Sequence, residues 1–317
     1  MEKEKRTLKE WFFAINPWAL PASAMPALAA VSYVFYCWFN ANSGTPVPGV
    51  HPIVSVSWWL GLAAFIGCEI FHASGNTMND YVDYTHGVDT PASIGVNRSL
   101  ISGRFKPKEI FIYSMSLMAT ACLIGLLIAF SLSAKAMWEL IAIGVLGALL
   151  TYFYTYLKYL ALGDLVIFIV YGLLVSQGMF LVMTHNLCWP LLMVSAPIGL
   201  WVVNILHCNN TRDRATDSAG GCRTRAYRLG TKGCIMMYDA LGIAAYVLLF
   251  IDACLEIVSW TVPILALASL PTAVKLMKKM EKCDDPQAIF KIDAETAQFV
   301  ILFAGLIILG NLTGVLL

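Results

Sequence analysis

Runs of about 20 apolar residues, the length of a membrane-spanning helix, recur along this chain of 317 residues. The composition agrees with them, because 59% of the residues are hydrophobic, only 13% are charged, and the mean hydropathy is +0.71. No Pro/Ser-rich or charge-rich linker separates the runs. The sequence therefore predicts an all-α fold, a polytopic membrane protein with a bundle of about nine transmembrane helices in a single domain, residues 1–317. The nine runs are expected at about 17–39, 57–75, 109–131, 137–157, 162–183, 189–207, 235–252, 257–275 and 295–315.

Basic residues are concentrated in one set of connections between these runs. If all nine runs cross the membrane, 20 of the 21 Lys and Arg residues lie on the side of the N-terminus, and only Lys135 lies on the other. The positive-inside rule then makes that side cytoplasmic and places the C-terminus outside. Residues 1–16 lack the apolar core and cleavage site of a signal peptide, and their Lys and aromatic residues predict an interfacial segment. We expect the membrane to be the cytoplasmic membrane of a bacterium.

The nine cysteines are dispersed, mostly within apolar runs, and no two form a C-x-x-C pair. This pattern is typical of small buried hydrophobic residues in a reduced setting, and it argues against a disulfide framework or a zinc site. Nothing in the sequence indicates a nucleic-acid partner, and the net charge of +1 adds no further information about partners. The oligomeric state is left open by the sequence.

A stripe of polar side chains begins inside the second apolar run and continues beyond it. Its members recur at steps of three and four residues, and they are Glu69, His72, Asn76, Asp80 and Asp83. If the helix continues past Gly75, all five share one face, which must turn into the bundle because lipid disfavours carboxylates. Asn79 and Asp83 are also four residues apart, and Asp89 follows across Gly87, where we expect the helix to end. The alternative is a solvated acidic loop or a polar contact between helices.

Two further motifs contain basic residues. Arg98 lies in a loop between residues 97 and 104, close in sequence to the acidic stripe, where an arginine could bind a diphosphate. Tyr154 and Lys158 are four residues apart at the end of the fourth run, and this lysine could contact a diphosphate or a substrate carboxylate. Taken alone, either basic residue could instead be a topology anchor at the membrane surface.

A second polar cluster follows the sixth apolar run. Its oxygen-bearing members lie at helical spacing, and they are Asn209, Asn210, Asp213 and Asp217. A basic run starts at Arg212, and its arginines could neutralise the aspartates without a metal. Carboxylate and amide oxygens without thiolates suit Mg²⁺ better than zinc. Two such clusters facing each other, from the cytoplasmic loops 76–108 and 209–232, could hold Mg²⁺ and a phosphorylated substrate.

Three segments together resemble the UbiA-type intramembrane prenyltransferases, and most closely the 1,4-dihydroxy-2-naphthoate polyprenyltransferases of menaquinone synthesis and their animal relatives. The resembling residues are 75–84 (GNTMNDYVDY) with 87–89 (GVD), 158–164 (KYLALGD), and 207–213 (HCNNTRD) with Asp217 and 228–230 (RLG). They agree with that family in kind, order and separation, and the expected nine-helix organisation agrees along the whole chain. One departure is Cys222, which stands where relatives commonly carry a lysine.

The resemblance implies a set of site residues and a metal cofactor. Mg²⁺, with Mn²⁺ as a substitute, would be bound by Asn79, Asp83, Asp213 and Asp217. Asp83, Asp213 and Lys158 would take part in the catalysis. The diphosphate and the acceptor would be bound by Asn76, Asp80, Asp89, Arg98, Tyr154, Asn209, Asn210 and Arg212.

The resemblance also implies a reaction, in which a polyprenyl diphosphate loses diphosphate and its allylic cation alkylates an aromatic acceptor in the bilayer. With 1,4-dihydroxy-2-naphthoate the ring carboxylate would leave as CO₂ and demethylmenaquinone would result. Other acceptors of such enzymes are 4-hydroxybenzoate, haem, a chlorophyll precursor and a glycerol phosphate. An ion-coupled transporter is a separate alternative, although transport sites lie near the bilayer midplane. A CDP-alcohol phosphotransferase is disfavoured because its D-G-x-x-A-R opening is absent.

Overall fold

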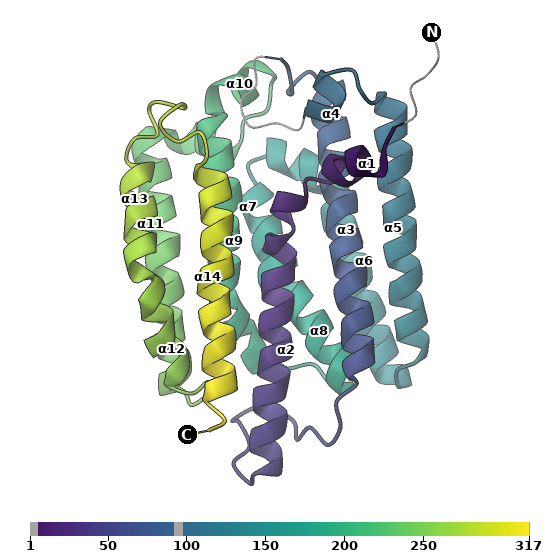
Figure 1. Ribbon diagram of the computed structural model, residues 1–317, viewed down its shortest axis with the longest axis vertical. Coiled ribbons are helices and arrows are strands. Elements are labelled where there is room, and N and C mark those ends of the chain that lie inside the picture. The colour runs from purple at the N-terminus through teal and green to yellow at the C-terminus, as the bar shows by residue number, and fades with distance from the viewer. Residues whose placement is uncertain (1–5, 92–97, 317) are drawn as a thin grey trace.

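The computed structural model describes residues 6–91 and 98–316, except for the side chain of Arg98. The regular elements within these ranges are helices (Figure 1). In chain order they are α1 (Leu8–Ala14), η1 (Pro17–Ala19), α2 (Pro21–Asn42), α3 (Trp58–Thr85), α4 (Arg98–Ile101), α5 (Pro107–Phe130), α6 (Ala134–Tyr159), α7 (Gly163–Ile167), η2 (Phe168–Leu174), α8 (Val175–Thr184), α9 (Trp189–Arg212), α10 (Arg214–Ala219), α11 (Arg225–Cys254), α12 (Thr261–Ala266), η3 (Leu267–Ser269), α13 (Leu270–Met280) and α14 (Ile292–Thr313).

Each of the nine predicted runs corresponds to a long helical segment in the described ranges. Eight of these segments, counted over the described residues, are long and apolar enough to cross a membrane. The remaining one is α3, which has 28 residues but carries the polar stripe, and the stripe lowers its mean hydropathy. The all-α, multi-pass membrane fold predicted from the sequence is therefore confirmed.

Helix α3 extends about ten residues beyond the end of its apolar run, which the sequence places at Gly75. It ends at Thr85, and Gly87 then adopts a φ of +73°, a left-handed conformation that favours glycine after a helix. The backbone N–H groups of Val88 and Asp89 both donate to the carbonyl of Asp83, at 2.9 and 3.2 Å. This turn brings Asp89 back towards Asp83.

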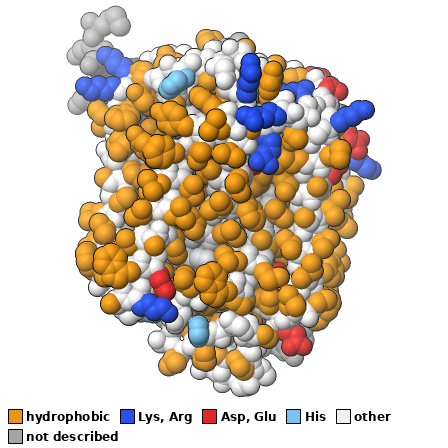
Figure 2. All heavy atoms as spheres, turned by 180° about the vertical axis from the view of Figure 1, so that it is seen from behind, with side chains coloured by type: hydrophobic (Ala, Val, Ile, Leu, Met, Phe, Trp, Pro, Cys, Tyr) orange, Lys and Arg blue, Asp and Glu red, His pale blue; other side chains and the backbone are white. Residues whose placement is uncertain are grey.

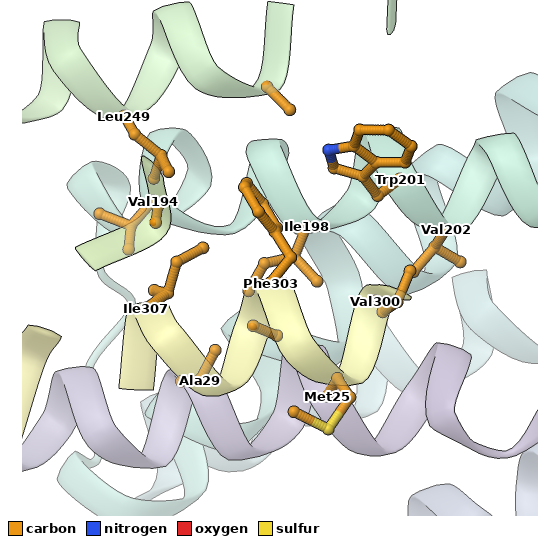
Figure 3. Packing of buried hydrophobic residues seen from close by; sticks show 14 of the residues in the cluster. Met25, Ala29, Val194, Ile198, Trp201, Val202, Leu249, Val300, Phe303 and Ile307 are labelled. Atoms are coloured by element: carbon orange, nitrogen blue, oxygen red, sulfur yellow. The ribbon is translucent and has the colours of Figure 1, made fainter. Parts of the chain in front are cut away.

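The interior of the bundle is formed mainly by α2, α9, α11 and α14, whose side chains interdigitate (Figure 3). Trp201 of α9 is fully buried, and its ring lies 4.3 Å, centroid to centroid, from that of Phe299 in α14. Because lipid is as apolar as these side chains, close packing rather than removal from water stabilises such contacts. Polar bonds add to them, as where Asn204 Nδ2 donates to the carbonyl of Tyr238 at 3.0 Å.

The outside of the bundle is apolar. In the most apolar window of α5 only 17% of the residues are buried, and in α6 only 11%, against 67% in α9. Figure 2 shows hydrophobic side chains over the middle of one face, with basic side chains mostly towards one end. Helices α5 and α6 therefore face lipid, as expected for a protein that exposes its apolar residues to hydrocarbon.

The connections with most of the basic residues lie at one end of the bundle, together with α1, α4 and α10 (Figure 1). Helix α1 lies across this end, where Arg6 Nη2 binds Glu109 Oε2 at 2.6 Å and Arg104 pairs with Glu10. Leu8 is 89% exposed, as expected for a helix at a membrane surface. The sequence prediction that these segments share one side agrees with this arrangement, whereas the identity of that side stays a prediction.

Candidate active site

A cavity of about 270 Å³ lies near the end of the bundle that carries α10, because Thr216 and Asp217 of that helix line it. Its polar wall is formed by both acidic clusters, and its apolar wall by residues such as Val170, Val202 and Ile205. The predicted site residues that line it are Asn76, Asn79, Asp80, Asp83, Asp89, Tyr154, Lys158, Asn209, Asp213 and Asp217. The structure therefore brings together segments that are more than a hundred residues apart in the sequence.

Asp83 lies at the centre of the first cluster and is almost fully buried. Its Oδ2 accepts hydrogen bonds from Lys158 Nζ at 2.6 Å and from Asn79 Nδ2 at 3.0 Å, and its Oδ1 accepts one from the Tyr159 hydroxyl at 3.1 Å. Lys158 is also buried, with a side-chain exposure of 8% against 4% for the aspartate. The last turn of α6 thus provides the cation that neutralises a carboxylate of α3.

Asp213 lies where α9 ends and α10 begins, and Arg212 next to it binds both of its oxygens. Arg212 Nε donates to Oδ1 at 2.9 Å and Nη2 donates to Oδ2 at 2.7 Å. The same guanidinium also pairs with Asp293 of α14 at 2.8 Å, and its side chain is fully buried. Arg212 therefore neutralises two aspartates at once, which is the alternative to metal binding that the sequence left open for this cluster.

The two clusters meet because a glycine allows two loops to touch. A Cβ atom on Gly220, at the end of α10, would lie 2.8 Å from the Cα of Val88, closer than real side chains permit. Val88 immediately precedes Asp89 in the turn after α3. The contact between these backbones fixes the distance between the acidic segments, and only a residue without a side chain fits there.

Carboxylates in this cavity share a poorly solvated space. The pKa of Asp89 is raised to about 7, mainly by burial and also by the neighbouring Asp83, while Lys158 opposes the rise. Burial likewise raises the pKa of Asp217 to about 7, against an opposing effect of Lys158. Burial also raises the pKa of Asp213, and Arg212 opposes this shift. The carboxylates of the cavity thus carry more negative charge than its buried cationic side chains neutralise.

This donor set fits a hard divalent cation in its chemistry. The oxygens come from carboxylates and amides without thiolates, which suits Mg²⁺. A bound cation would also offset the burial, and the weaker repulsion from Asp213 and Asp83, that raise the pKa of Asp217. In the arrangement of the described side chains, however, no three Asp, Glu, His or Cys residues converge as a metal site. Asp83 and Asp213 are paired with Lys158 and Arg212 instead. The predicted roles of Asn79, Asp83, Asp213 and Asp217 as metal ligands stay predictions.

Three of the predicted site residues are not among the described residues that line the cavity. Asn210 and Arg212 are buried and are not among the described residues that line the cavity, although Arg212 contacts Asp213, which does line it. Arg98 begins α4, and its side chain lies outside the described part of the structure. A role for any of these three in substrate binding stays a prediction.

Sequence reasoning missed several contacts around the site. Asn16 and Trp18 also line the cavity, and Asn16 Nδ2 donates to Asp80 Oδ2 at 3.1 Å. Asp164 ends the resembling segment 158–164 and pairs with Arg225 Nε at 3.1 Å, a partner that its presence in the motif does not reveal. Asn16 lies in the interfacial segment, far from any motif. Only the folded arrangement places it here.

Cys222 is fully buried, and its backbone N–H donates to the carbonyl of Asp217 at 2.8 Å. Burial raises the pKa of its thiol to about 12, and Lys158 opposes the shift, so these two side chains are neighbours. A second cationic side chain at position 222 would lie close to Lys158. The departure from the family pattern therefore places a neutral thiol beside the buried lysine.

Comparison with known proteins identifies the family. The model of the UbiA prenyltransferase family matches residues 50–294. The chain belongs to the UbiA prenyltransferase family. It is thus a membrane-embedded enzyme that transfers isoprenyl groups, and the transporter alternative is excluded.

Curated relatives of two kinds are similar to this UbiA-family chain. The UbiA prenyltransferase domain-containing protein 1 of Danio rerio is 30% identical over 296 residues, which cover 92% of this chain and 80% of the relative. The 1,4-dihydroxy-2-naphthoate octaprenyltransferase of Bacillus subtilis is 30% identical over 198 residues, or 61% of this chain and 62% of the relative. These relatives come from an animal and a bacterium, so they do not show a bacterial origin for this chain.

Solved structures share the fold at low sequence identity. A digeranylgeranylglyceryl phosphate synthase has a TM-score of 0.60 at 18% identity, over 99% of both chains. A UbiA homologue from Archaeoglobus fulgidus, bound to GPP and Mg²⁺, has a TM-score of 0.58 at 14% identity, over 94% of this chain and 99% of that one. At these identities the similarity establishes the common fold.

Proposed function

We propose that this UbiA-family enzyme transfers a polyprenyl group from its diphosphate to 1,4-dihydroxy-2-naphthoate, with release of diphosphate and CO₂. The observation that carries the proposal is the convergence of Asn79, Asp83, Asp213, Asp217 and Lys158 on one cavity. The similarity to a bacterial enzyme that is named for this acceptor supports the choice of naphthoate. The more extensive similarity to the animal relatives keeps the acceptor open to test.

The residues around the cavity suit both steps of this reaction, the departure of diphosphate and the alkylation of the acceptor by the allylic cation. Lys158 lies in the polar wall, where its ammonium group would stabilise the negative charge that develops on the leaving diphosphate. Mg²⁺, bound by the aspartates and Asn79, would neutralise the diphosphate and so make it a better leaving group. Tyr154 and Tyr171 present aromatic rings to the same cavity, and such rings stabilise a nearby cation. The apolar wall excludes water, which would otherwise capture the allylic cation.

We further propose that the end of the bundle with the cavity faces the cytoplasm, where soluble prenyl-acceptor precursors and Mg²⁺ are available. The concentration of 20 of the 21 Lys and Arg residues towards that side supports this orientation.

The test is radiolabelled prenyl transfer by the purified protein in liposomes, with 1,4-dihydroxy-2-naphthoate, 4-hydroxybenzoate and glycerol phosphate supplied separately. We expect a lipid-soluble product with the naphthoate, and labelled CO₂ from a carboxyl-labelled acceptor. Activity should require Mg²⁺ or Mn²⁺ and be lost with excess chelator. Transfer to another acceptor alone would contradict the naphthoate assignment, and full activity in chelator would contradict the metal-dependent mechanism.

Replacement of single aspartates tests the same site. Asp83→Asn and Asp213→Asn should each lower turnover by about 10² or more, because electrostatic stabilisation of a leaving group is usually a large contribution. Asp285→Asn is the matched control, since this exposed aspartate lies in the connection before α14, outside the cavity lining. Equal turnover of all three variants would contradict the assignment of the cavity as the active site.

A further inference from the structure

A chain of three hydrogen-bonding side chains lies beside the polar wall, and the proposed reaction does not use it. Ser23 Oγ of α2 lies 2.7 Å from Glu69 Oε1 and also 2.7 Å from His72 Nδ1, both in α3. Ser23 is fully buried, His72 is almost fully buried, and Glu69 is half-buried. His72 lines the cavity, whereas Glu69 lies one helical turn further into the membrane. The three groups therefore connect the cavity to a carboxylate inside the bundle.

The two short contacts limit how many protons Ser23, Glu69 and His72 can share. Each of these contacts is a hydrogen bond and needs one proton, but the Ser23 hydroxyl has only one to donate, for which the Leu20 carbonyl, at a longer 3.0 Å, also competes. If Ser23 donates to an ionised Glu69, the second proton is on His72 Nδ1, which donates to Ser23. If Ser23 donates to His72, the second proton is on Glu69. The two arrangements differ only by a shift of the protons along the chain.

We propose, on the basis of the function proposed above, that His72, Ser23 and Glu69 form a proton relay that deprotonates the ring hydroxyl of the acceptor. In the first arrangement Nδ1 carries a proton, and Nε2 of His72 is the nitrogen that accepts one from a molecule in the cavity. The Nδ1 proton then passes to Ser23, and the Ser23 proton passes to Glu69. His72 returns to its neutral form, and Glu69 becomes a neutral carboxylic acid.

The bonds that form and the bonds that break in the proposed alkylation balance. As the proton leaves the ring hydroxyl, its O–H electron pair moves into the ring, and a ring carbon forms a bond to C1 of the prenyl group. The C1–O bond of the prenyl diphosphate breaks, and its electron pair leaves with the diphosphate. The ring regains aromaticity by losing CO₂ or, where the alkylated carbon carries a hydrogen, by passing that proton to the released diphosphate. In both cases the oxygen takes its own proton back from the relay. The relay itself is unchanged after each turnover.

The location of Glu69 explains why a relay would be favourable here. A proton that stayed on His72 would create a buried cation in an apolar bundle, which is costly without a close partner. Transfer to Glu69 removes a charge from the bundle. Two other polar residues near His72 are Asn76, whose Nδ2 donates to the carbonyl of Ile15 at 3.1 Å, and Tyr171, whose ring centroid lies 4.7 Å from that of the imidazole. Neither is a carboxylate that could replace Glu69 as the final proton acceptor.

Two variants and one control test the relay. Glu69→Gln keeps the size and the hydrogen bond to Ser23 but does not accept a proton, and Ser23→Ala separates Glu69 from His72. Ser32→Ala is the matched control, because Ser32 is also buried in α2 and hydrogen-bonded, to Ala29 and Asn311, away from the cavity. Turnover with 1,4-dihydroxy-2-naphthoate and with 4-hydroxybenzoate is measured for each, together with the affinity for an unreactive prenyl thiolodiphosphate.

We expect both relay variants to lose about tenfold to a hundredfold in kcat, as is typical of acid–base groups. Their affinity for the thiolodiphosphate should stay within about twofold of wild type, and Ser32→Ala should behave as wild type; these small changes mark an intact bundle. Positional exchange of a heavy-oxygen label within the prenyl diphosphate, which reports ionisation alone, should also persist in both variants.

Wild-type turnover in Glu69→Gln, or a loss of thiolodiphosphate affinity that matches the loss of turnover, would overturn the relay while leaving the proposed function intact. A wild-type protein that exchanges the label but alkylates neither hydroxyl-bearing ring would overturn the proposed function, and the relay with it. The two failures are thus distinguished by the wild-type assay.

Discussion

Asp83 shows how much the chemistry at this site depends on single residues. Three side chains donate to its two oxygens, and one of them, Lys158, carries the compensating charge at 2.6 Å. In a poorly solvated cavity an aspartate without such partners is costly. Any residue that contacts Asp83 therefore affects both the stability of the bundle and the binding of a charged substrate.

Lys158→Gln is expected to lower catalytic efficiency by about one to two decades, the equivalent of roughly 1.5–3 kcal/mol for a charge-assisted hydrogen bond. It should also lower the thermal stability, because it leaves Asp83 buried without its cation. Steady-state kinetics and thermal melts of the purified protein measure the two effects. Lys282→Gln, at an exposed lysine near the same end of the bundle, is the control.

The double variant Lys158→Gln with Asp83→Asn separates these effects. It removes both charges, so the melting temperature should recover towards wild type while the activity stays low. Wild-type efficiency in a correctly folded Lys158→Gln protein would show that the lysine is only a topology anchor.

At the scale of helices and loops, close backbone contacts position the acidic segments. Gly220 at the end of α10 touches Val88 in the turn after α3, and Gly199 of α9 lies against Gly172 of η2, where a Cβ on Gly199 would come within 2.5 Å of the Gly172 Cα. The first contact joins the second half of the chain to the first half, and the second contact joins two elements of the second half. The geometry of the cavity therefore depends on residues that have no chemistry of their own.

Gly220→Ala should push α10 away from the turn at Val88 and separate Asp217 from Asp89. Overpacking of this kind costs about 1–3 kcal/mol, and we expect turnover to fall at least about tenfold, because catalysis depends on small displacements. Gly305→Ala makes the same change in α14, where nothing lies within 4 Å of the added Cβ, and should leave turnover unchanged. Equal activity of the two variants would show that the contact at Gly220 does not position the site.

The attachment of helix α1 to the bundle is expected to depend on pH. Hydrogen bonds from Arg104, and then the backbone N–H of Thr7, lower the pKa of Glu10 from 4.5 to about 2. Because the folded pKa is the lower one, the interaction contributes fully above pH 4.5 and is lost as the pH falls towards 2. A fluorescent label on Leu8→Cys should report release of α1 in that range.

The same release is expected at neutral pH in Glu10→Gln, with faster tryptic cleavage after Lys9. Glu281→Gln, at an exposed glutamate outside α1, should leave the cleavage rate unchanged. If Glu10→Gln also left it unchanged, the ion pair with Arg104 would not be what holds α1 against the bundle.

At the scale of the whole molecule, the nine predicted crossings place both acidic clusters at one end of the bundle (Figure 1). Single cysteines at Ser102 and Ser218, in a background without reactive native thiols, should react with an impermeant reagent only from the cytoplasmic side. A cysteine at Asn186, in the connection between α8 and α9, should react only from outside. Labelling of positions 102 and 218 from opposite sides would contradict the fold as well as the orientation.

The sequence by itself predicted the nine membrane crossings and the stripe of polar side chains on α3. Hydrocarbon imposes a helix of fixed length on every apolar run, and helical spacing puts Glu69, His72, Asn76 and Asp83 on one face, so both features follow from local pattern. The convergence of most motif residues on one cavity was likewise expected, because Asn79 and Asp213 follow apolar runs that end on the same side.

Only the tertiary structure decided which groups are partners. Lys158 pairs with Asp83, Arg212 binds Asp213 and Asp293, and Ser23 bridges Glu69 and His72. Each partnership joins different elements or depends on how a helix is rotated against its neighbours, and rotation is set by packing contacts such as Gly220 on Val88 rather than by local pattern. The sequence therefore predicts a membrane helix bundle with an acidic face, while three-dimensional packing determines which of its charges are neutralised and which side chains can share a proton.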